Sequence, residues 1–376
     1  MDSTRLSKFV ALFVFLTLRV ALAQSAPATG IVEGRVTCED TGVPARLAIV
    51  RLYPLANYLP KTDEPKPRAP DPASTDFDGD FQFVHVWPGI FLVKVEEDGY
   101  NKNFEFTLHN LDLFPATRQR EVLSQLPQVT VKSGGISRVD VVIRRSAAIS
   151  GHVSFDSGGA LIGPNGDITA TLVRSDLLKD DNGQPLQNGS SGLFTESAAP
   201  DDRGIYRIAG LPPGEYRIDL DLHGSAARLS GTQNEDRKPV SADLTVFAPD
   251  ALSQNKAKLV EVEEGGEVSD VDITIPLSRL HSISGVIVQH RSANSNLFLT
   301  LRAVQPDGST HDINGGIRLD SGGSFRFDLL PSGSYIIEVK NLERTSETKL
   351  ASLTVVVGET DVLDANIDLG YTTPHK

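Results

Sequence analysis

The sequence repeats one pattern three times along its 376 residues, and an internal repeat constrains a fold more than any other sequence signal. In each copy a Gly opens a run of alternating apolar residues, a short turn follows, and a second Gly stands ten residues after the first. The three copies are the segments 79–89, 204–214 and 323–333, and they align without gaps. A chain built this way is expected to fold as three similar units in tandem.

Two further blocks flank each copy. An opening block with a Gly before a β-branched position lies at 33–36, 150–153 and 284–287. A closing block lies at 129–143, 259–275 and 353–369. Together the blocks predict three domains, with the bounds 24–146, 147–279 and 280–376.

The periodicity of these blocks predicts strands. Apolar residues alternate with polar ones at a period of two, which is typical of a half-buried strand. We expect Phe81, Tyr206 and Phe325 to occupy equivalent core positions, and Val86, Leu211 and Leu330 to be buried beside them. The segment 108–126 comes nearest to a helical pattern, but Pro115 interrupts it. The fold class is therefore all-β, with three tandem Ig-like or prealbumin-like Greek-key β-sandwiches.

At this point the sequence resembles a known family. The first repeat carries Ala48-Ile-Val-Arg-Leu52, then Asp76-x-Asp-Gly79-x-Phe-x-Phe83, a Pro-Gly turn and a Gly-Tyr100 ending. This pattern resembles the carboxypeptidase regulatory-like domain. The resemblance implies a transthyretin-like β-sandwich, which is grouped with carbohydrate-binding-like folds. The second repeat lacks the Gly-Tyr ending, and the third is the most divergent copy. The matching residues are turn and core residues, so they are informative about fold and much less so about function.

The first 23 residues are predicted to be a signal peptide. Arg5 and Lys8 precede an apolar run of about ten residues, and Ala21-Leu-Ala23 forms an A-x-A cleavage site. The run is too short to span a bilayer, and no later stretch is apolar enough, so the mature chain is predicted to have no transmembrane span. We expect a secreted or periplasmic protein. The single cysteine, Cys38, excludes a disulfide scaffold, and no role is assigned to it.

Three polar or Pro-rich inserts interrupt the repeats. The segment 54–75 holds six prolines and is predicted to run as an extended loop. The segments 175–199 and 223–243 are rich in polar residues and are predicted to be mobile loops of the second domain.

The sequence offers no convincing catalytic or cofactor site. None of the eight His residues starts a zinc-type motif, and a Ser-x-x-Lys match at Ser253 and at Ser346 lacks its companion motifs. A net charge of −13 argues against nucleic-acid binding. We therefore expect a non-enzyme with no cofactor and no metal. The run Asp76–Asp80 leaves two alternatives open, an ordinary tight turn or a weak calcium site.

The remaining aromatic residues are candidates for ligand contacts. When the aromatic residues at core positions are set aside, Tyr53, Tyr58 and Trp87 are left. Trp87 replaces the turn residues Pro212 and Pro331 of the other copies. An exposed ring can stack on the apolar face of a sugar. The resemblance to carbohydrate-binding-like folds implies carbohydrate as the ligand class, so we expect an exported binding or spacer protein with a polysaccharide ligand. The alternative is a structural module that contacts an envelope protein. For Trp87, the competing interpretation is packing against the 54–75 loop.

Overall fold

The computed structural model describes residues 28–59, 66–100, 102–161, 166–180, 182–187, 192–222, 244–288, 297–305, 307–313, 317–318, 323–343 and 346–370. The predicted signal peptide and the insert 223–243 lie outside these residues. The chain divides into two compact units, an N-terminal unit of residues 1–145 and a C-terminal unit of residues 146–376. No helix among the described residues is long and apolar enough to cross a membrane.

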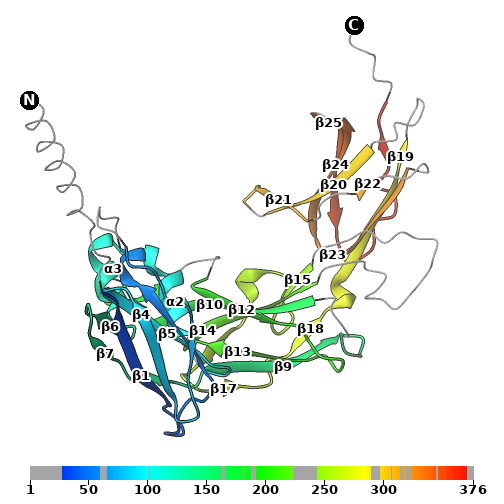
Figure 1. Ribbon diagram of the computed structural model, residues 1–376. Coiled ribbons are helices and arrows are strands. Elements are labelled where there is room, and N and C mark those ends of the chain that lie inside the picture. The colour runs from blue at the N-terminus through cyan, green and yellow to red at the C-terminus, as the bar shows by residue number, and fades with distance from the viewer. Residues whose placement is uncertain are drawn as a thin grey trace, which may run out of the picture. The chain divides into compact units, whose positions relative to one another are not determined.

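The N-terminal unit is a sandwich of two sheets (Figure 1). One sheet has the order β4-β1-β7, with β8 also paired to β1, and the other has the order β3-β2-β5-β6. Strand β1 runs antiparallel to β4 but parallel to β7 and β8. The strands are β1 (Gly30–Cys38), β2 (Ile49–Pro54), β3 (Ala73–Ser74), β4 (Asp80–Val86), β5 (Gly89–Glu96), β6 (Gln128–Val131), β7 (Ile136–Arg138) and β8 (Val141–Ile143).

Two short helices follow β5, where the sequence predicted at most one helical turn. Pro115 ends no helix here. It is the N-cap of the second helix, a position at which its missing N–H costs nothing. The buried residues Phe106 and Leu123 belong to these helices, and Leu92 of β5 is buried although it does not belong to the core between the sheets. The elements are η1 (Leu55–Asn57), α2 (Asn103–His109), η2 (Leu111–Leu113) and α3 (Ala116–Leu123).

The first part of the C-terminal unit repeats this arrangement. One sheet has the order β13-β9-β17, with β18 also paired to β9. The second sheet has the order β11-β10-β14-β15, with β12 on β10 and β16 on β14. The strands are β9 (Ala147–Phe155), β10 (Gly166–Lys179), β11 (Pro185–Gln187), β12 (Phe194–Ala198), β13 (Ile205–Leu211), β14 (Gly214–Leu222), β15 (Leu244–Phe247), β16 (Leu259–Val262), β17 (Glu267–Val268) and β18 (Ile273–Ile275), with η3 (Gln254–Lys256) between β15 and β16 and η4 (Leu277–Arg279) after β18.

The prediction of a mobile loop at 175–199 is wrong for most of that segment. Strand β10 extends through it to Lys179, and β11 and β12 fold back against β10. The sequence did not predict these strands because their side chains are mostly polar. Backbone pairing does not need apolar side chains, so such strands lack the alternating pattern. The insert 54–75 contains η1 and the short strand β3, and its described residues 66–72 have no regular structure, as a Pro-rich segment predicts.

The last part of the chain contributes two more sheets. Their orders are β23-β19-β26 and β21-β20-β24-β25, with β22 on β20. The strands are β19 (Leu280–Val288), β20 (Leu297–Val304), β21 (Thr310–Asp312), β22 (Ile317–Arg318), β23 (Ser324–Pro331), β24 (Gly333–Glu343), β25 (Ser346–Val357) and β26 (Ile367–Asp368). The all-β prediction is thereby confirmed.

The predicted core residues are buried in all three repeats. Phe81, Tyr206 and Phe325 are each at most 5% exposed. Their neighbours Val86, Leu211 and Leu330 are buried as well. The register of the repeat is therefore confirmed.

The two strands of each central block belong to different sheets. Strand β4 pairs with β1, while β5 pairs with β2, so the turn between them carries the chain across the sandwich. A bulge precedes this turn in each repeat, and its residue has a positive φ: 58° at His85, 81° at Gly210 and 59° at Leu329. A bulge of this kind bends a strand, which here aims the chain at the opposite sheet.

One contact recurs at the opening Gly of each repeat. The Cβ of an alanine at Gly34, Gly151 or Gly285 would lie 1.8, 2.1 or 2.3 Å from the carbonyl oxygen of Val139, Val271 or Ala365, respectively. The side chain of the residue that follows each carbonyl accepts a hydrogen bond from a backbone N–H of the opening strand. These bonds run from Arg35 to Asp140 (3.0 Å), from His152 to Asp272 (2.9 Å) and from Val286 to Asn366 (2.9 Å). The opening and closing blocks of the sequence are thus two sides of one contact.

The three-domain organisation remains a prediction, and truncation tests it. One buried cluster lies wholly between Val32 and Ile143, and another lies wholly between Ile283 and Ile367. We expect a chain cut after Arg145, and a fragment 280–376, to give soluble β-type circular dichroism with cooperative melting, because each keeps its own apolar core. A fragment that ends at Leu126 is the control, since it lacks β6, β7 and β8 and should not fold. Unfolded spectra for the first two fragments would contradict the predicted boundaries.

Candidate functional site

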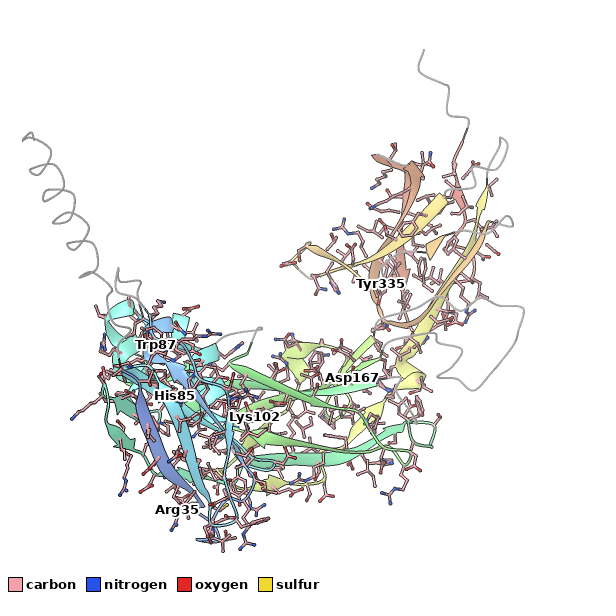
Figure 2. All side chains as sticks on the ribbon, viewed as in Figure 1. Arg35, His85, Trp87, Lys102, Asp167 and Tyr335 are labelled. Carbon is pink, nitrogen blue, oxygen red and sulfur yellow. The ribbon has the colours of Figure 1, made fainter. Side chains whose placement is uncertain are left out.

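Trp87 lies in the turn between β4 and β5 and is 42% exposed. Figure 2 shows it at the end of the N-terminal unit opposite to Arg35. The 54–75 insert reaches this turn, because a Cβ at Gly89 would lie 2.9 Å from the side chain of Pro67. The indole therefore offers part of its surface to solvent beside the insert.

Tyr53 lies on the face of β2 that points away from the sandwich core, but it is only half-exposed. Its ring packs on Phe104 of α2, with 5.3 Å between the ring centroids and 38° between the ring planes. Phe104 therefore covers part of this ring, and a ligand contact at Tyr53 stays a prediction. The sequence did not indicate helix α2, which supplies Phe104.

Tyr58 follows η1 and is half-buried, and burial raises the pKa of its hydroxyl. The nearby Lys94 ammonium lies 2.8 Å from Glu96 and 2.6 Å from Glu105. Burial lowers the pKa of Lys94, but the bonds to these two carboxylates outweigh it and leave the pKa above its usual value. The register places Tyr58 toward the same end of the sandwich as Trp87, since Pro54 lies opposite Phe91. The charge of Lys94 near Tyr58 is neutralised by Glu96 and Glu105.

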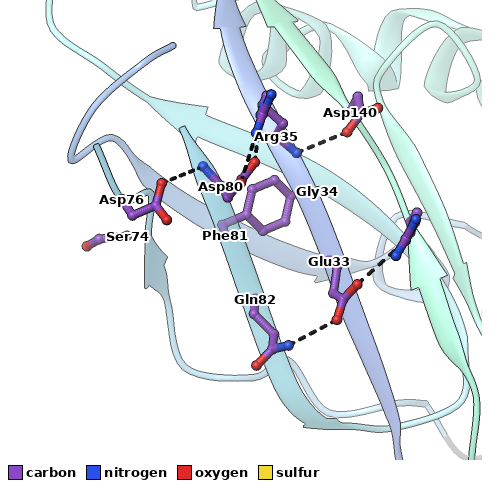
Figure 3. Close-up of a pocket in the computed structure, with 10 residues that line it drawn as sticks. Glu33, Gly34, Arg35, Ser74, Asp76, Asp80, Phe81, Gln82 and Asp140 are labelled. Atoms are coloured by element: carbon purple, nitrogen blue, oxygen red, sulfur yellow. Dashed lines mark hydrogen bonds and ion pairs between the residues drawn. The ribbon is translucent and has the colours of Figure 1, made fainter. Parts of the chain in front are cut away.

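A polar hollow of about 680 Å³ lies at the other end of the same unit (Figure 3). It is formed over β1 and β4, with Ser74 and Asp76 on one side and residues from the end of β7 on the other. Its volume falls within the range of small-ligand sites. The lining residues are Glu33, Gly34, Arg35, Ser74, Asp76, Asp80, Phe81, Gln82, Arg138 and Asp140.

Exposed ion pairs and hydrogen bonds line this hollow. Arg35 donates twice to Asp80, with 2.6 Å from Nε to Oδ1 and 3.0 Å from Nη2 to Oδ2. The bond from Arg35 lowers the pKa of Asp80, so its carboxylate stays ionised at neutral pH. Gln82 Nε2 donates to Glu33 over 3.1 Å, and Arg138 lies 3.5 Å from Glu33. Exposed pairs of this kind contribute about 0–1 kcal/mol each, so a ligand hydroxyl can replace one partner at little cost.

The run Asp76–Asp80 forms a tight turn. Asp76 Oδ1 accepts the backbone N–H groups of Asp78 and Asp80, both over 2.9 Å. Asp201 makes the same two bonds with Arg203 and Ile205. Within the described part of the chain, no three His, Cys, Asp or Glu side chains gather as metal ligands would. The geometry favours the turn interpretation of this run.

One member of each Ser-x-x-Lys match makes a polar contact outside the pair. The Ser253 hydroxyl donates to Asn255 over 2.8 Å, and Lys349 forms an ion pair with Glu338 over 2.7 Å. Cys38 is a buried free thiol in the core of the N-terminal unit. These three groups are all engaged in structural contacts.

An exposed apolar tip was missed in the sequence. Phe77 is 70% exposed in the turn that follows Asp76, and Val43 and Leu47 are exposed in the neighbouring loop. Arg46 Nε donates to the Phe77 carbonyl over 3.0 Å and joins the two loops. The repeat alignment carried the signal, because Phe77 stands where the other copies have Asp202 and Ser321.

Comparison with known proteins gives structural matches alone. No family model matches the sequence, and no curated protein matches it. The resemblance to the carboxypeptidase regulatory-like domain therefore stays an interpretation of motifs.

Similar solved structures include three bacterial proteins. The TIE protein of Bacillus anthracis has 13% identity and a TM-score of 0.21, and the match covers 91% of this chain but 51% of that one, so this chain spans about half its length. A streptococcal ancillary pilin has 13% identity, a TM-score of 0.28, and coverage of 90% and 99%. A Pseudomonas aeruginosa protein provisionally described as carbohydrate binding has 19% identity, a TM-score of 0.20, and coverage of 35% and 88%. All three TM-scores are below 0.3, and the matches assign no family to this chain.

Proposed function

We propose that the chain is an exported, non-catalytic binding and spacer protein whose ligand site is the polar hollow over β1 and β4. The observation that carries the proposal is the hollow itself, which presents planar carboxylate, amide and guanidinium groups from adjacent strands. Side chains of these types offer both donors and acceptors at fixed spacing. A polyhydroxylated ligand presents the same mixture, so the ligand class proposed is carbohydrate.

The charge of the hollow supports a neutral rather than an anionic sugar. Four carboxylates line it, from Glu33, Asp76, Asp80 and Asp140, against two guanidinium groups. An anionic polymer would meet a net negative surface. Neutral polysaccharides and oligosaccharides are therefore the first ligands to test.

The test is isothermal titration of the secreted chain with a panel of soluble neutral polysaccharides. Gln82→Ala and Arg138→Ala are each expected to weaken binding about tenfold, which corresponds to one or two lost hydrogen bonds. Neither change should unfold the protein, because Gln82 is exposed and the Arg138 side chain is 82% exposed. Arg207→Ala is the matched control, since Arg207 aligns with Gln82 in the second repeat.

The variant Trp87→Phe tests whether the ligand binds in the hollow or at Trp87, the site expected from the sequence. If binding falls with Trp87→Phe and survives Gln82→Ala, the ligand contacts the β4–β5 turn and the hollow is not the site. Absence of binding to every polysaccharide would overturn the carbohydrate proposal. The fluorescence of the single tryptophan gives a second readout for ligands near Trp87.

A protein–protein role is the second candidate, and the apolar tip of Val43, Leu47 and Phe77 favours it. Exposed large apolar side chains that gather on adjoining loops are typical of contact surfaces. Such a role would make the chain a structural module of the cell envelope. Loss of a co-purifying envelope protein on Phe77→Ser, with polysaccharide binding absent, would support this candidate over the first.

A further inference from the structure

Strand β25 forms the edge of its sheet over twelve residues, from Ser346 to Val357. It pairs along one side with β24, and no strand among the described residues pairs with its other side. Figure 1 shows β25 at the margin of this sheet, beside β24. A long edge strand exposes a row of backbone N–H and C=O groups that can accept another strand.

Glu347, Lys349 and a bulge at Leu350 lie in the first part of β25, but the rest of the strand has no side chain that would prevent such pairing. The eight residues 350–357 read Leu-Ala-Ser-Leu-Thr-Val-Val-Val, with no charge, no Pro and no Gly. Natural sheet edges are commonly protected by a Pro, an inward charge or a short length. Val356 is 69% exposed on the outer face, and Ser352 and Thr354 are exposed on the same face.

The corresponding edges of the other repeats are short. Strand β6 has four residues, and β15 and β16, which both pair with β14, have four residues each. At this edge of the sandwich, a long open strand therefore occurs in the third repeat alone among the described strands. A feature that one copy of a repeat has gained calls for an explanation specific to that copy.

We propose that β25 pairs antiparallel with β25 of a second copy of this chain, about a two-fold axis at Thr354. Two features of β25, its alternation of core-facing residues and its flanking charges, argue for the second copy as occupant and for this register. A continuous sheet must keep core-facing residues on one side, so the axis must pass through a residue and not between two residues. With the axis at Thr354, the core-facing Leu353 lies opposite Val355, and the exposed Ser352 lies opposite Val356.

The charges that flank the segment favour an axis at Thr354 over an axis shifted by two residues. Lys349 and Glu359 bound the uncharged stretch, and an axis at Thr354 brings Lys349 of each copy toward Glu359 of the other. Opposite charges across strands are favourable, whereas an axis shifted by two residues leaves each of them facing an uncharged residue. The strand is thus complementary to itself.

The pairing is expected to be weak. Two edges joined over fewer than ten residues bury less than the roughly 1,200 Å² typical of stable complexes. We expect a monomer–dimer equilibrium in the micromolar range, measurable by sedimentation velocity of the secreted chain between about 1 and 200 μM. A constant monomer mass over this range would overturn the proposal.

Two substitutions test the register. Thr354→Lys would set two ammonium groups directly opposite each other, and it should shift dimerisation at least tenfold toward monomer. Thr354→Cys should form an intermolecular disulfide with oxidised glutathione as the oxidant, because the two sulfur atoms would face each other across the axis. Ser352→Cys is the matched control and should not cross-link, since its partner is Val356.

The buried thiol of Cys38 is not expected to interfere with the cross-linking test. Equal cross-linking through both cysteine variants, or a dimer that survives Thr354→Lys with unchanged circular dichroism, would overturn the proposed pairing. If Thr354→Lys does not fold, the comparison of the two cysteine variants still decides. The result is independent of carbohydrate binding, which the hollow variants of the N-terminal unit report.

Discussion

Gly34→Ala is expected to destabilise the N-terminal unit by about 3 kcal/mol or more, at the upper end of what overpacking costs. The added Cβ would lie 1.8 Å from the Val139 carbonyl oxygen and 2.7 Å from the ring of Phe81. A backbone carbonyl held by two strands cannot retreat without breaking the pairing of β1 with the closing strands. The Val139 N–H also bonds the Glu33 carbonyl over 3.0 Å, which fixes the approach.

The measurement is urea unfolding followed by tryptophan fluorescence. The single tryptophan, Trp87, lies in this unit, so its signal reports the unit selectively. Gly135→Ala is the matched control, because a Cβ there meets nothing closer than 3.6 Å and the φ of Gly135 is not positive. It should change the free energy of unfolding by less than about 1 kcal/mol. Equal effects of the two substitutions would contradict the proposed role of the opening Gly.

The same substitution should be costly in the other repeats. Gly151→Ala and Gly285→Ala meet the Val271 and Ala365 carbonyl oxygens at 2.1 and 2.3 Å. Gly358→Ala, where a Cβ meets nothing within 4 Å, is the control for the third repeat.

Truncation of the central aromatic residue should cost about 3–5 kcal/mol in each repeat. Phe81→Ala, Tyr206→Ala and Phe325→Ala each remove a ring that is at most 5% exposed and leave a cavity between the two sheets. Hydrogen exchange followed by mass spectrometry locates the loss, because faster exchange should be confined to the repeat that carries the substitution. Exchange that stays slow after truncation would mean that these rings do not support the core.

Tyr206→Phe separates the ring from its hydroxyl. The Tyr206 hydroxyl donates to the Val271 carbonyl, the same oxygen that approaches Gly151. Phe81 and Phe325 do without this bond at the equivalent positions. Removal of the hydroxyl alone should therefore cost about 1 kcal/mol, well below the cost of Tyr206→Ala.

The sequence was sufficient for the strands of the repeated blocks and for their core faces. Alternation at a period of two identified Phe81, Tyr206 and Phe325 as buried, because a strand sends successive side chains to opposite faces whatever surrounds it. The Asp and Gly residues also predicted the tight turns, because the geometry of a turn depends on residues that are adjacent in the chain. The polar strands β11 and β12 were missed because backbone pairing with β10 leaves no mark in a polar segment.

The candidate sites were less predictable. The contact between Tyr53 and Phe104 could not be foreseen, because α2 supplies Phe104 from about fifty residues further along the chain. The hollow could not be foreseen, since it collects side chains from β1, β4 and the closing segment. Phe77 could have been found, because the repeat alignment that singled out Trp87 also sets Phe77 apart from Asp202 and Ser321.

The sequence by itself determined the repeat, the strand periodicity, the turns and the identity of the core residues, because each depends on residues that are close along the chain. The tertiary structure decided which strands share a sheet. It sends β4 and β5 to opposite sheets and runs β1 parallel to β7 and β8, and it pairs β25 on one side only within the described part of the chain. These outcomes depend on backbone hydrogen bonds between segments as far apart as Glu33 and Val139, and such bonds carry no residue-specific signal. The opening Gly of each repeat depends on both. The sequence shows that this position has no side chain, and only the fold shows the carbonyl oxygen that leaves no room for one.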